Sequence, residues 1–192
     1  MSKAVMLSIR PKWAEKIANG EKRIEVRKTR PKMNTPFKCY IYCTLPKYPH
    51  EDFIATDYPM PQFYGGGKVI GEFTCDRIYK IDKDSTDFLF KAGDLSVYKQ
   101  AAEEKCSLRV AMTDDELHGY LGHCQGYGWH ITDLRIYDAP RELSEFRRSC
   151  QNSWYCESCA MYRGNNGTCG NESLQIKRAP QSWCYVEEAE DV

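Results

Sequence analysis

The sequence predicts a fold of the α+β class, arranged as a small mixed β-barrel with two or three helices. Short apolar segments of strand length are interrupted by only a few helical segments, and no regular βαβ alternation is present. With 192 residues, of which 42% are hydrophobic, the chain can bury one sizeable core. We therefore expect one domain over residues 1–192.

The first half of the chain contains one helix among strands. We expect strands at 4–9, 22–29 and 37–44 and a helix at 11–19. Pro11 suits the first turn of the helix, where its missing N–H has no intrahelical partner. Asn19-Gly20 is typical of the left-handed turn that ends a helix. The helix should therefore stop just before the second strand begins.

The strand expected at 22–29 separates two kinds of side chain. Because successive side chains in a strand point to opposite faces, Ile24 and Val26 should share one face. Arg23, Glu25 and Arg27 should share the other face. This segment therefore presents two cations and a carboxylate beside an apolar surface.

The second half of the chain predicts both strands and helices. We expect strands at 68–81, 127–137 and 182–186, and helices at 95–106 and from 114 to about 119–122. Gly71 indicates a bend or bulge in the first of these strands. Thr113 followed by Glu116 is the pattern of a capping box, which opens a helix.

Two segments are expected to be insertions into this domain. Residues 45–66 are rich in proline and aromatic residues, which is typical of an ordered surface loop or lid. Residues 147–178 form a C-terminal cysteine-rich insert. Both could present a surface to a protein partner.

Charge and hydropathy limit the possible locations and ligands. The chain has no apolar run long enough to span a membrane and no apolar N-terminal segment typical of a signal peptide, so we expect a cytoplasmic protein without membrane contact. Residues 1–38 carry eleven Lys or Arg against three Glu, a balance of +8, although the whole chain is neutral. Affinity for an anion should therefore come from one face.

Four late cysteines predict a structural zinc site. Cys156 and Cys159 form a CxxC pair, and Cys150 and Cys169 lie on either side of it. Four thiolates can hold a tetrahedral zinc ion and order an otherwise loose insert. The alternative is a surface loop with reduced cysteines or with two disulfides.

Several of these segments resemble ASCH domains, which are members of the PUA-like superfamily. The signature is Leu7-Ser8-Ile9-Arg10-Pro11 followed by Gly20-x-Lys22-x-x-Glu25-x-Arg27. Ile131-Thr132-Asp133-Leu134 and the closing segment 180–186 are also similar to ASCH proteins of bacteria and their phages. The resemblance covers most of the chain outside the two insertions.

The resemblance implies a PUA-like barrel with a basic cleft that binds RNA or a modified nucleobase. Lys22 and Arg27 would hold a phosphate or a base carbonyl, Glu25 would accept a hydrogen bond from an exocyclic amine, and Arg10 would add positive charge at the rim. Trp13 would stack on a base, and Trp129 and Trp183 are alternatives. Spacing alone allows a plainer interpretation, in which Glu25 and Arg27 form an exposed ion pair and Lys22 is solvated.

The resemblance also implies a possible hydrolase. Some small ASCH proteins are amidohydrolases that act on N4-acetylated cytidine with a lysine and a threonine nucleophile, and others are linked to RNA cleavage. Lys22 matches the lysine, but Glu25 stands where the threonine is expected, so it could act only as a general base. We therefore expect binding of RNA or a modified nucleoside first, hydrolysis at the same cleft second, and a protein interaction module third.

Overall fold

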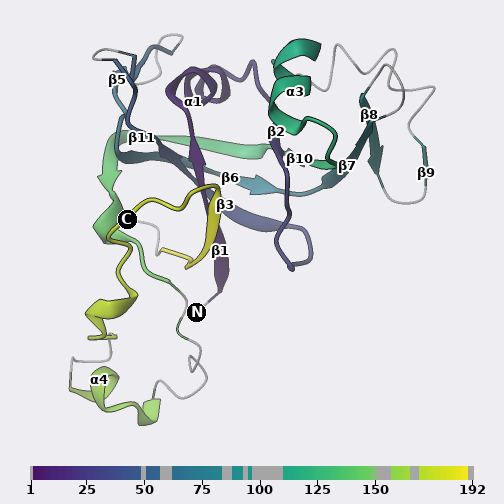
Figure 1. The fold of residues 1–192 in the computed structure, drawn as a ribbon. Coiled ribbons are helices and arrows are strands. Elements are labelled where there is room, and N and C mark those ends of the chain that lie inside the picture. Colours follow the sequence, from purple (N-terminus) through teal and green to yellow (C-terminus); the bar gives the residue numbers. More distant parts are fainter. Residues whose placement is uncertain are drawn as a thin grey trace.

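The protein is built from two five-stranded sheets and a short two-stranded sheet (Figure 1). The computed structural model describes residues 2–48, 51–56, 62–83, 88–92, 95–96, 110–148, 150, 157–164 and 169–189. The predicted α+β class is confirmed. The described strands form separate hydrogen-bonded sheets and do not close into a single barrel.

The first sheet forms around the N-terminal strand. Its order is β11 (Thr132–Glu142), β6 (Lys68–Cys75), β3 (Phe37–Cys43), β1 (Lys3–Ile9) and β12 (Trp183–Glu187). Strand β1 runs parallel to β3 and antiparallel to β12. Six consecutive residues of β1 are buried, as expected for an apolar strand with neighbours on both sides.

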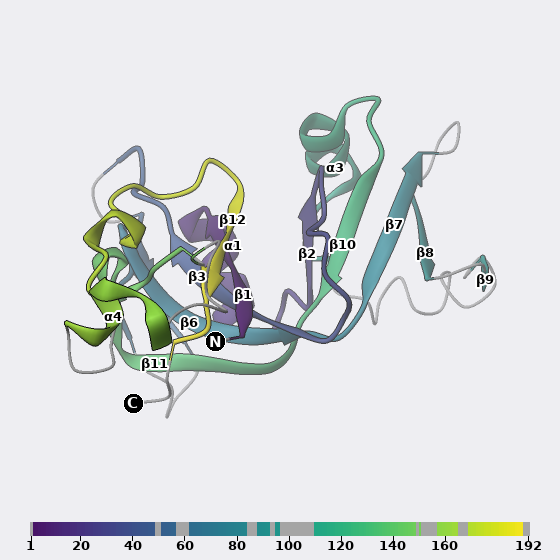
Figure 2. The same cartoon turned by 90° about the horizontal axis from the view of Figure 1, so that it is seen from below.

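The second sheet stands beside the first, as Figure 2 shows. Its order is β2 (Ile24–Arg27), β10 (Gly126–His130), β7 (Ile78–Lys83), β8 (Phe88–Ala92) and β9 (Leu95–Ser96). Strand β2 forms one edge of this sheet and pairs antiparallel with β10. The side chains of β2 are therefore placed where the two sheets meet.

The chain passes between the two sheets at two corners. Each of the long strands predicted at 68–81 and 127–137 is in fact two strands, because the chain leaves one sheet and enters the other at 76–77 and at Ile131. Each break is only one or two residues long and lies within a run of strand-forming residues, so the sequence pattern predicted one continuous strand in each case. Nδ1 of His130 lies 2.7 Å from Oδ1 of Asp76 and joins the two corners.

Gly71 lies at the predicted irregularity in β6. The pairing of β6 with β3 shifts register between Ile41 and Tyr42, next to this glycine. A Cβ atom on Gly71 would lie 2.4 Å from the carbonyl oxygen of Arg135. Glycine is required here because the backbone of β11 approaches too closely for any side chain.

Three α-helices are described: α1 (Pro11–Ala18), α3 (Asp114–Leu121) and α4 (Ala160–Arg163). Short 3-10 turns occur at η1 (Leu143–Glu145) and η3 (Glu172–Leu174). The capping box of Thr113 and Glu116 opens α3 as predicted. The helix predicted at 95–106 is wrong at its start, where Leu95 and Ser96 pair with β8, and its remainder lies outside the described residues.

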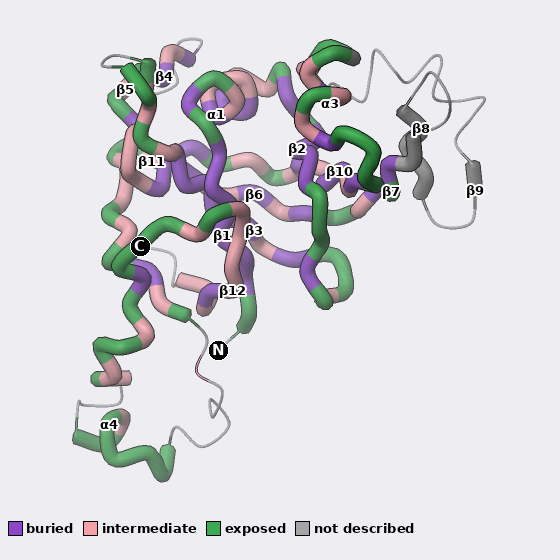
Figure 3. Tube along the Cα trace, in the orientation of Figure 1, coloured by how far each residue is buried: buried purple, intermediate pink, exposed green. Residues whose placement is uncertain are grey.

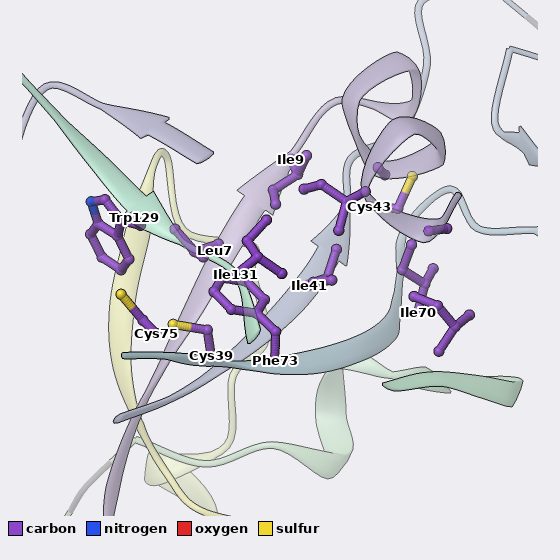
Figure 4. Close-up of a cluster of buried hydrophobic side chains, with 14 of the residues drawn as sticks. Leu7, Ile9, Cys39, Ile41, Cys43, Ile70, Phe73, Cys75, Trp129 and Ile131 are labelled. Atoms are coloured by element: carbon purple, nitrogen blue, oxygen red, sulfur yellow. The ribbon is translucent and has the colours of Figure 1, made fainter. Parts of the chain in front are cut away.

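The main core fills the space between the first sheet, α1 and β10 (Figure 4). Trp129 packs against Phe37 with ring centroids 5.7 Å apart. Ile24 and Val26 of β2 point the other way, against Leu117 and Leu121 of α3, as the alternation predicted. Figure 3 shows that the buried residues are concentrated along β1, β3, β6 and β2.

The described residues of the two predicted insertions contain a few short elements. In 45–66, strands β4 (Phe53–Ile54) and β5 (Phe63–Tyr64) form the two-stranded sheet. In 147–178, the helix α4 and the turn η3 are described. Their status as insertions stays a prediction. Among the described residues, no helix is long and apolar enough to cross a membrane.

Candidate functional site

A cleft of about 630 Å³ lies between the end of β1, α1, β2 and α3. The structure brings five predicted site residues to its wall: Arg10, Trp13, Lys22, Glu25 and Arg27. They come from the junction between β1 and α1 and from the segment through β2, two stretches that are separated by one helix. The walls thus belong to both sheets, and the cleft depends on how the two sheets are joined.

The turn after α1 directs Lys22 into the interior. Gly20 adopts a φ of +70°, in the left-handed region that glycine enters most readily. The backbone N–H of Lys22 then donates to the carbonyl of Lys16, at 2.9 Å. As a result the side chain of Lys22 is only 1% exposed. The interpretation of Lys22 as a solvated residue is wrong.

The ammonium of Lys22 has three kinds of neighbour. Nζ donates to the carbonyl oxygen of Val110 at 2.7 Å and lies 3.5 Å from Oε2 of Glu25. It also lies 5.3 Å from the centre of the Trp13 ring, within the range of a cation–π contact. Burial lowers the pKa of Lys22, and the nearby carboxylate of Glu25 offsets only part of this effect.

Glu25 lies between the two buried cations. Oε1 of Glu25 is 3.0 Å from Nη2 of Arg27, while Oε2 is the atom close to Lys22. Nη2 of Arg27 also donates to the carbonyl oxygen of Ser8 at 2.8 Å. Nε of Arg27 is buried and has no hydrogen-bond partner within the described part of the chain. The predicted ion pair is present, but it is buried in the cleft wall.

The rim of the cleft carries surface charges of both signs. Arg10 is exposed and stands at the start of α1. Nζ of Lys12 lies 2.5 Å from Oε1 of Glu116, so an ion pair connects α1 with α3 across the cleft. The hydrogen bond from Lys12 is the largest cause of a lowered pKa at Glu116. The pair is largely exposed, so it contributes little to stability.

The three tryptophans predicted as stacking residues lie in different surroundings. Trp13 is partly exposed and lines the cleft. Trp129 is fully buried in the core, and Trp183 packs against it with ring centroids 6.0 Å apart. Nε1 of Trp183 donates to Oγ1 of Thr29, outside the cleft. Of the predicted stacking residues, Trp13 is therefore the one that lines the cleft.

The sequence did not identify two other parts of the cleft wall. Met112 and Tyr120 come from α3 and the segment before it, and residues 180–182 come from the segment before β12. Ser8 fixes this last segment, because its Oγ donates to the carbonyl of Pro180 at 2.6 Å. The family resemblance had singled out residues 180–186, which include this part of the wall. No sequence pattern indicated that α3 lies over the cleft.

The predicted zinc ligands are only partly described. Cys150, Cys159 and Cys169 are free thiols, and Cys156 lies outside the described residues. Within the described residues, no group of three or more candidate ligands is close enough to hold a metal. The four-cysteine zinc site is therefore still a prediction.

Three of the earlier cysteines belong to the hydrophobic core. Cys39, Cys43 and Cys75 are fully buried and form part of the main core (Figure 4). Burial raises the pKa of Cys43 and the pKa of Cys75 to about 12. These two thiols therefore stay protonated and unreactive at neutral pH.

Comparisons with known proteins agree with the resemblance found in the sequence. Residues 7–43 match the ASCH domain family model. The fold is similar to the crystal structure of ASCH from Zymomonas mobilis, with a TM-score of 0.52 and 14% identity, covering 96% of this chain and 88% of that one.

Two mutants of the Zymomonas mobilis ASCH protein have equally similar structures. Their TM-scores are 0.51 and 0.52, each at 14% identity, and they cover 97% and 96% of this chain and 92% and 89% of theirs. At this identity the likeness establishes the fold alone. No curated protein sequence matches the chain.

Proposed function

We propose that this protein, which carries an ASCH domain and has the fold of an ASCH protein, binds RNA or a modified nucleobase in the cleft. The proposal rests on one structural observation. Two buried cations, a buried carboxylate and a partly exposed tryptophan converge on one concave surface. Convergent charged and aromatic groups in a cleft of this size are typical of ligand sites.

The charges of the cleft favour an electron-rich ligand. Lys22 and Arg27 outnumber Glu25 in the buried wall, and Arg10 adds a cation at the rim. The buried Nε of Arg27 has no acceptor in the described residues, and leaving such a donor unpaired costs about 1–3 kcal/mol. Arg27 is part of the cleft wall, so its guanidinium group supports recognition of a carbonyl or phosphate oxygen.

The aromatic side chains of the wall suit a planar base. Trp13 lies on α1 and Tyr120 lies on α3, and both line the cleft. Stacking of a base on an aromatic side chain contributes about 1–3 kcal/mol and tolerates different bases. Because Lys22, Lys12 and Lys16 all approach the Trp13 ring, a base stacked there would also be surrounded by positive charge.

A hydrolase at the same cleft is the second candidate. It is favoured by the lowered pKa of Lys22, because a lysine with a lowered pKa gives up its proton more readily than an ordinary lysine. The contacts of Glu25 count against a strong general base, because each carboxylate oxygen lies near a cation. If catalysis occurs, Lys22 is the better candidate for proton transfer.

Titration of a labelled single-stranded RNA and of an acylated cytidine tests the proposal. We expect RNA affinity that weakens with salt and that falls about 5- to 150-fold in Trp13→Ala, from the loss of one stacking contact. Tyr48→Ala is the matched control, because Tyr48 is exposed and lies outside the cleft.

The outcomes distinguish the three candidate functions, which are RNA or nucleobase binding, hydrolysis and interaction with a protein. Turnover of the acylated cytidine, abolished in Lys22→Ala, would establish the hydrolase. RNA binding that Trp13→Ala leaves unchanged would contradict the proposed site. Absence of both binding and turnover in the unmodified protein would favour a protein interaction module.

A further inference from the structure

A second concave surface follows directly after the motif. It has a volume of about 580 Å³ and is formed by residues 28–34, which connect β2 to β3 (Figure 1), together with Tyr127 of β10. We call this surface the basic groove. Three of its residues are exposed cations, Lys28, Arg30 and Lys32.

The described part of the chain leaves the cations of the basic groove without a counter-charge. Within the described residues, no carboxylate forms an ion pair with Lys28, Arg30 or Lys32. Other exposed lysines do have such partners, as in the pair of Lys68 with Glu142 at 2.8 Å. Three unpaired cations on one short loop make a surface that attracts a polyanion.

The basic groove adjoins the cleft. Lys28 of the groove lies with Nζ 5.6 Å from the centre of the Tyr120 ring, and Tyr120 lines the cleft. Arg27, the residue before Lys28, is itself part of the cleft wall. Across the β2–β10 ladder, Arg27 pairs with Tyr127, which lines the groove. A chain that leaves the cleft beside Tyr120 therefore meets Lys28 first.

The loop of the basic groove is held in place by β12. Nε1 of Trp183 donates to Oγ1 of Thr29 at 2.9 Å, and the backbone N–H of Lys32 donates to the hydroxyl of Tyr185 at 2.8 Å. The guanidinium of Arg30 lies 5.8 Å from the centre of the Tyr127 ring. A surface that is fixed before binding costs less to order when a ligand arrives.

We propose that the ligand of the cleft is one nucleotide of a longer RNA strand, whose neighbouring phosphates lie along the basic groove against Lys28, Arg30 and Lys32. This inference rests on the proposed function, since it requires a nucleotide in the cleft. It narrows the ligand from a free nucleoside to a single strand, because a free nucleoside carries no phosphate for these cations. The cleft selects the base and the groove supplies affinity that does not depend on sequence.

The test compares the salt dependence of RNA binding in three variants. The first is Lys28→Ala/Arg30→Ala/Lys32→Ala, the second is Trp13→Ala, and the third is the charge-matched control Lys47→Ala/Arg148→Ala/Arg163→Ala. The control residues are exposed and line neither concave surface. The probe is a fluorescein-labelled single-stranded RNA of mixed sequence, titrated from low to physiological salt, and thermal unfolding checks that each variant is folded.

The expected signatures differ between groove and cleft. Each phosphate contact to a single strand contributes about 0.7 to the slope of log affinity against log salt, so loss of three contacts should reduce the slope by about 2. Trp13→Ala should lower affinity with the slope unchanged, and the control should retain the affinity and slope of the unmodified protein.

Two results would overturn the inference. Only one of them would also contradict the proposed function. If the groove variant keeps the slope of the unmodified protein while Trp13→Ala loses affinity, the inference fails and the proposed function stands. If the unmodified protein does not bind the RNA, both fail.

Discussion

Nζ of Lys22 lies 3.5 Å from Oε2 of Glu25, and both side chains are buried in the wall of the cleft. The same carboxylate lies 3.0 Å from Nη2 of Arg27 through its other oxygen. Glu25 therefore balances two buried cations that belong to one short segment of sequence. The properties of the cleft depend on this arrangement, and so does part of the stability of the fold.

Replacing Glu25 by alanine should destabilise the protein strongly. The change leaves Lys22 and Arg27 buried without a counter-charge, and breaking a buried pair from one side costs about 3–5 kcal/mol. The free energy of unfolding in urea measures the loss. Glu21→Ala is the control, because it removes only an exposed pair with Lys16 and should cost far less. Equal effects of the two changes would contradict a buried charge network.

The buried Lys22 should make stability rise with pH in the alkaline range. Its pKa is lowered in the folded protein, so between that value and the ordinary value of 10.5 the unfolded chain binds more protons at this residue. The free energy of unfolding then increases with pH in this window. The free energy of unfolding in urea should be measured from neutral pH to about pH 10 for the unmodified protein and for Lys22→Met. The value for the unmodified protein minus the value for Lys22→Met should increase with pH.

Taking that difference cancels the opposite contribution of Cys43 and Cys75, whose raised pKa values make stability fall above their ordinary value of 9.0. A difference that does not change with pH would show that Lys22 is not buried as described.

Two glycine substitutions should have opposite effects. Gly71→Ala would bring a Cβ atom to 2.4 Å from the backbone oxygen of Arg135, so we expect a loss of about 1–3 kcal/mol of stability. Gly119→Ala meets no atom within 4 Å, and alanine favours a helix, so it should stabilise α3 by up to about 1 kcal/mol. Thermal unfolding of both variants checks this pair. A neutral Gly71→Ala would contradict the close approach of β6 and β11.

The cysteine-rich insert should bind one zinc ion. The prediction rests on the spacing of Cys150, Cys156, Cys159 and Cys169, which supplies four thiolates within one insert. Elemental analysis of protein purified without chelator should give one equivalent of zinc, and Cys159→Ser should reduce it. Cys124→Ser is the control, because Cys124 is an exposed cysteine outside the insert. Absence of zinc from the unmodified protein would contradict the prediction.

Local patterns predicted the elements that depend on neighbouring residues. The alternation of Ile24 and Val26 with Glu25 and Arg27 gave the faces of β2, and the capping box gave the start of α3. Gly71 marked the irregularity in β6. These features follow from backbone geometry over a few residues, so a sequence pattern suffices to predict them.

Features that depend on distant segments could not be predicted in the same way. The burial of Lys22 requires the carbonyl of Val110, which lies 88 residues away in sequence. The cleft needs Tyr120 of α3 opposite Trp13 of α1, and no local pattern fixes that placement. The two corners between the sheets lie within runs of strand-forming residues, so no local pattern marked them. There, Asp76 and His130 form a contact that only the assembled fold creates.

The most direct test of the account is to map where RNA contacts the protein. A single-stranded RNA containing a photoactivatable uridine would be crosslinked to the full chain, and the crosslinked peptides identified by mass spectrometry. The account predicts crosslinks in peptides that contain Trp13, Tyr120 and the residues of the basic groove. Crosslinks confined to the hairpin of β4 and β5 or to the cysteine-rich insert would contradict it.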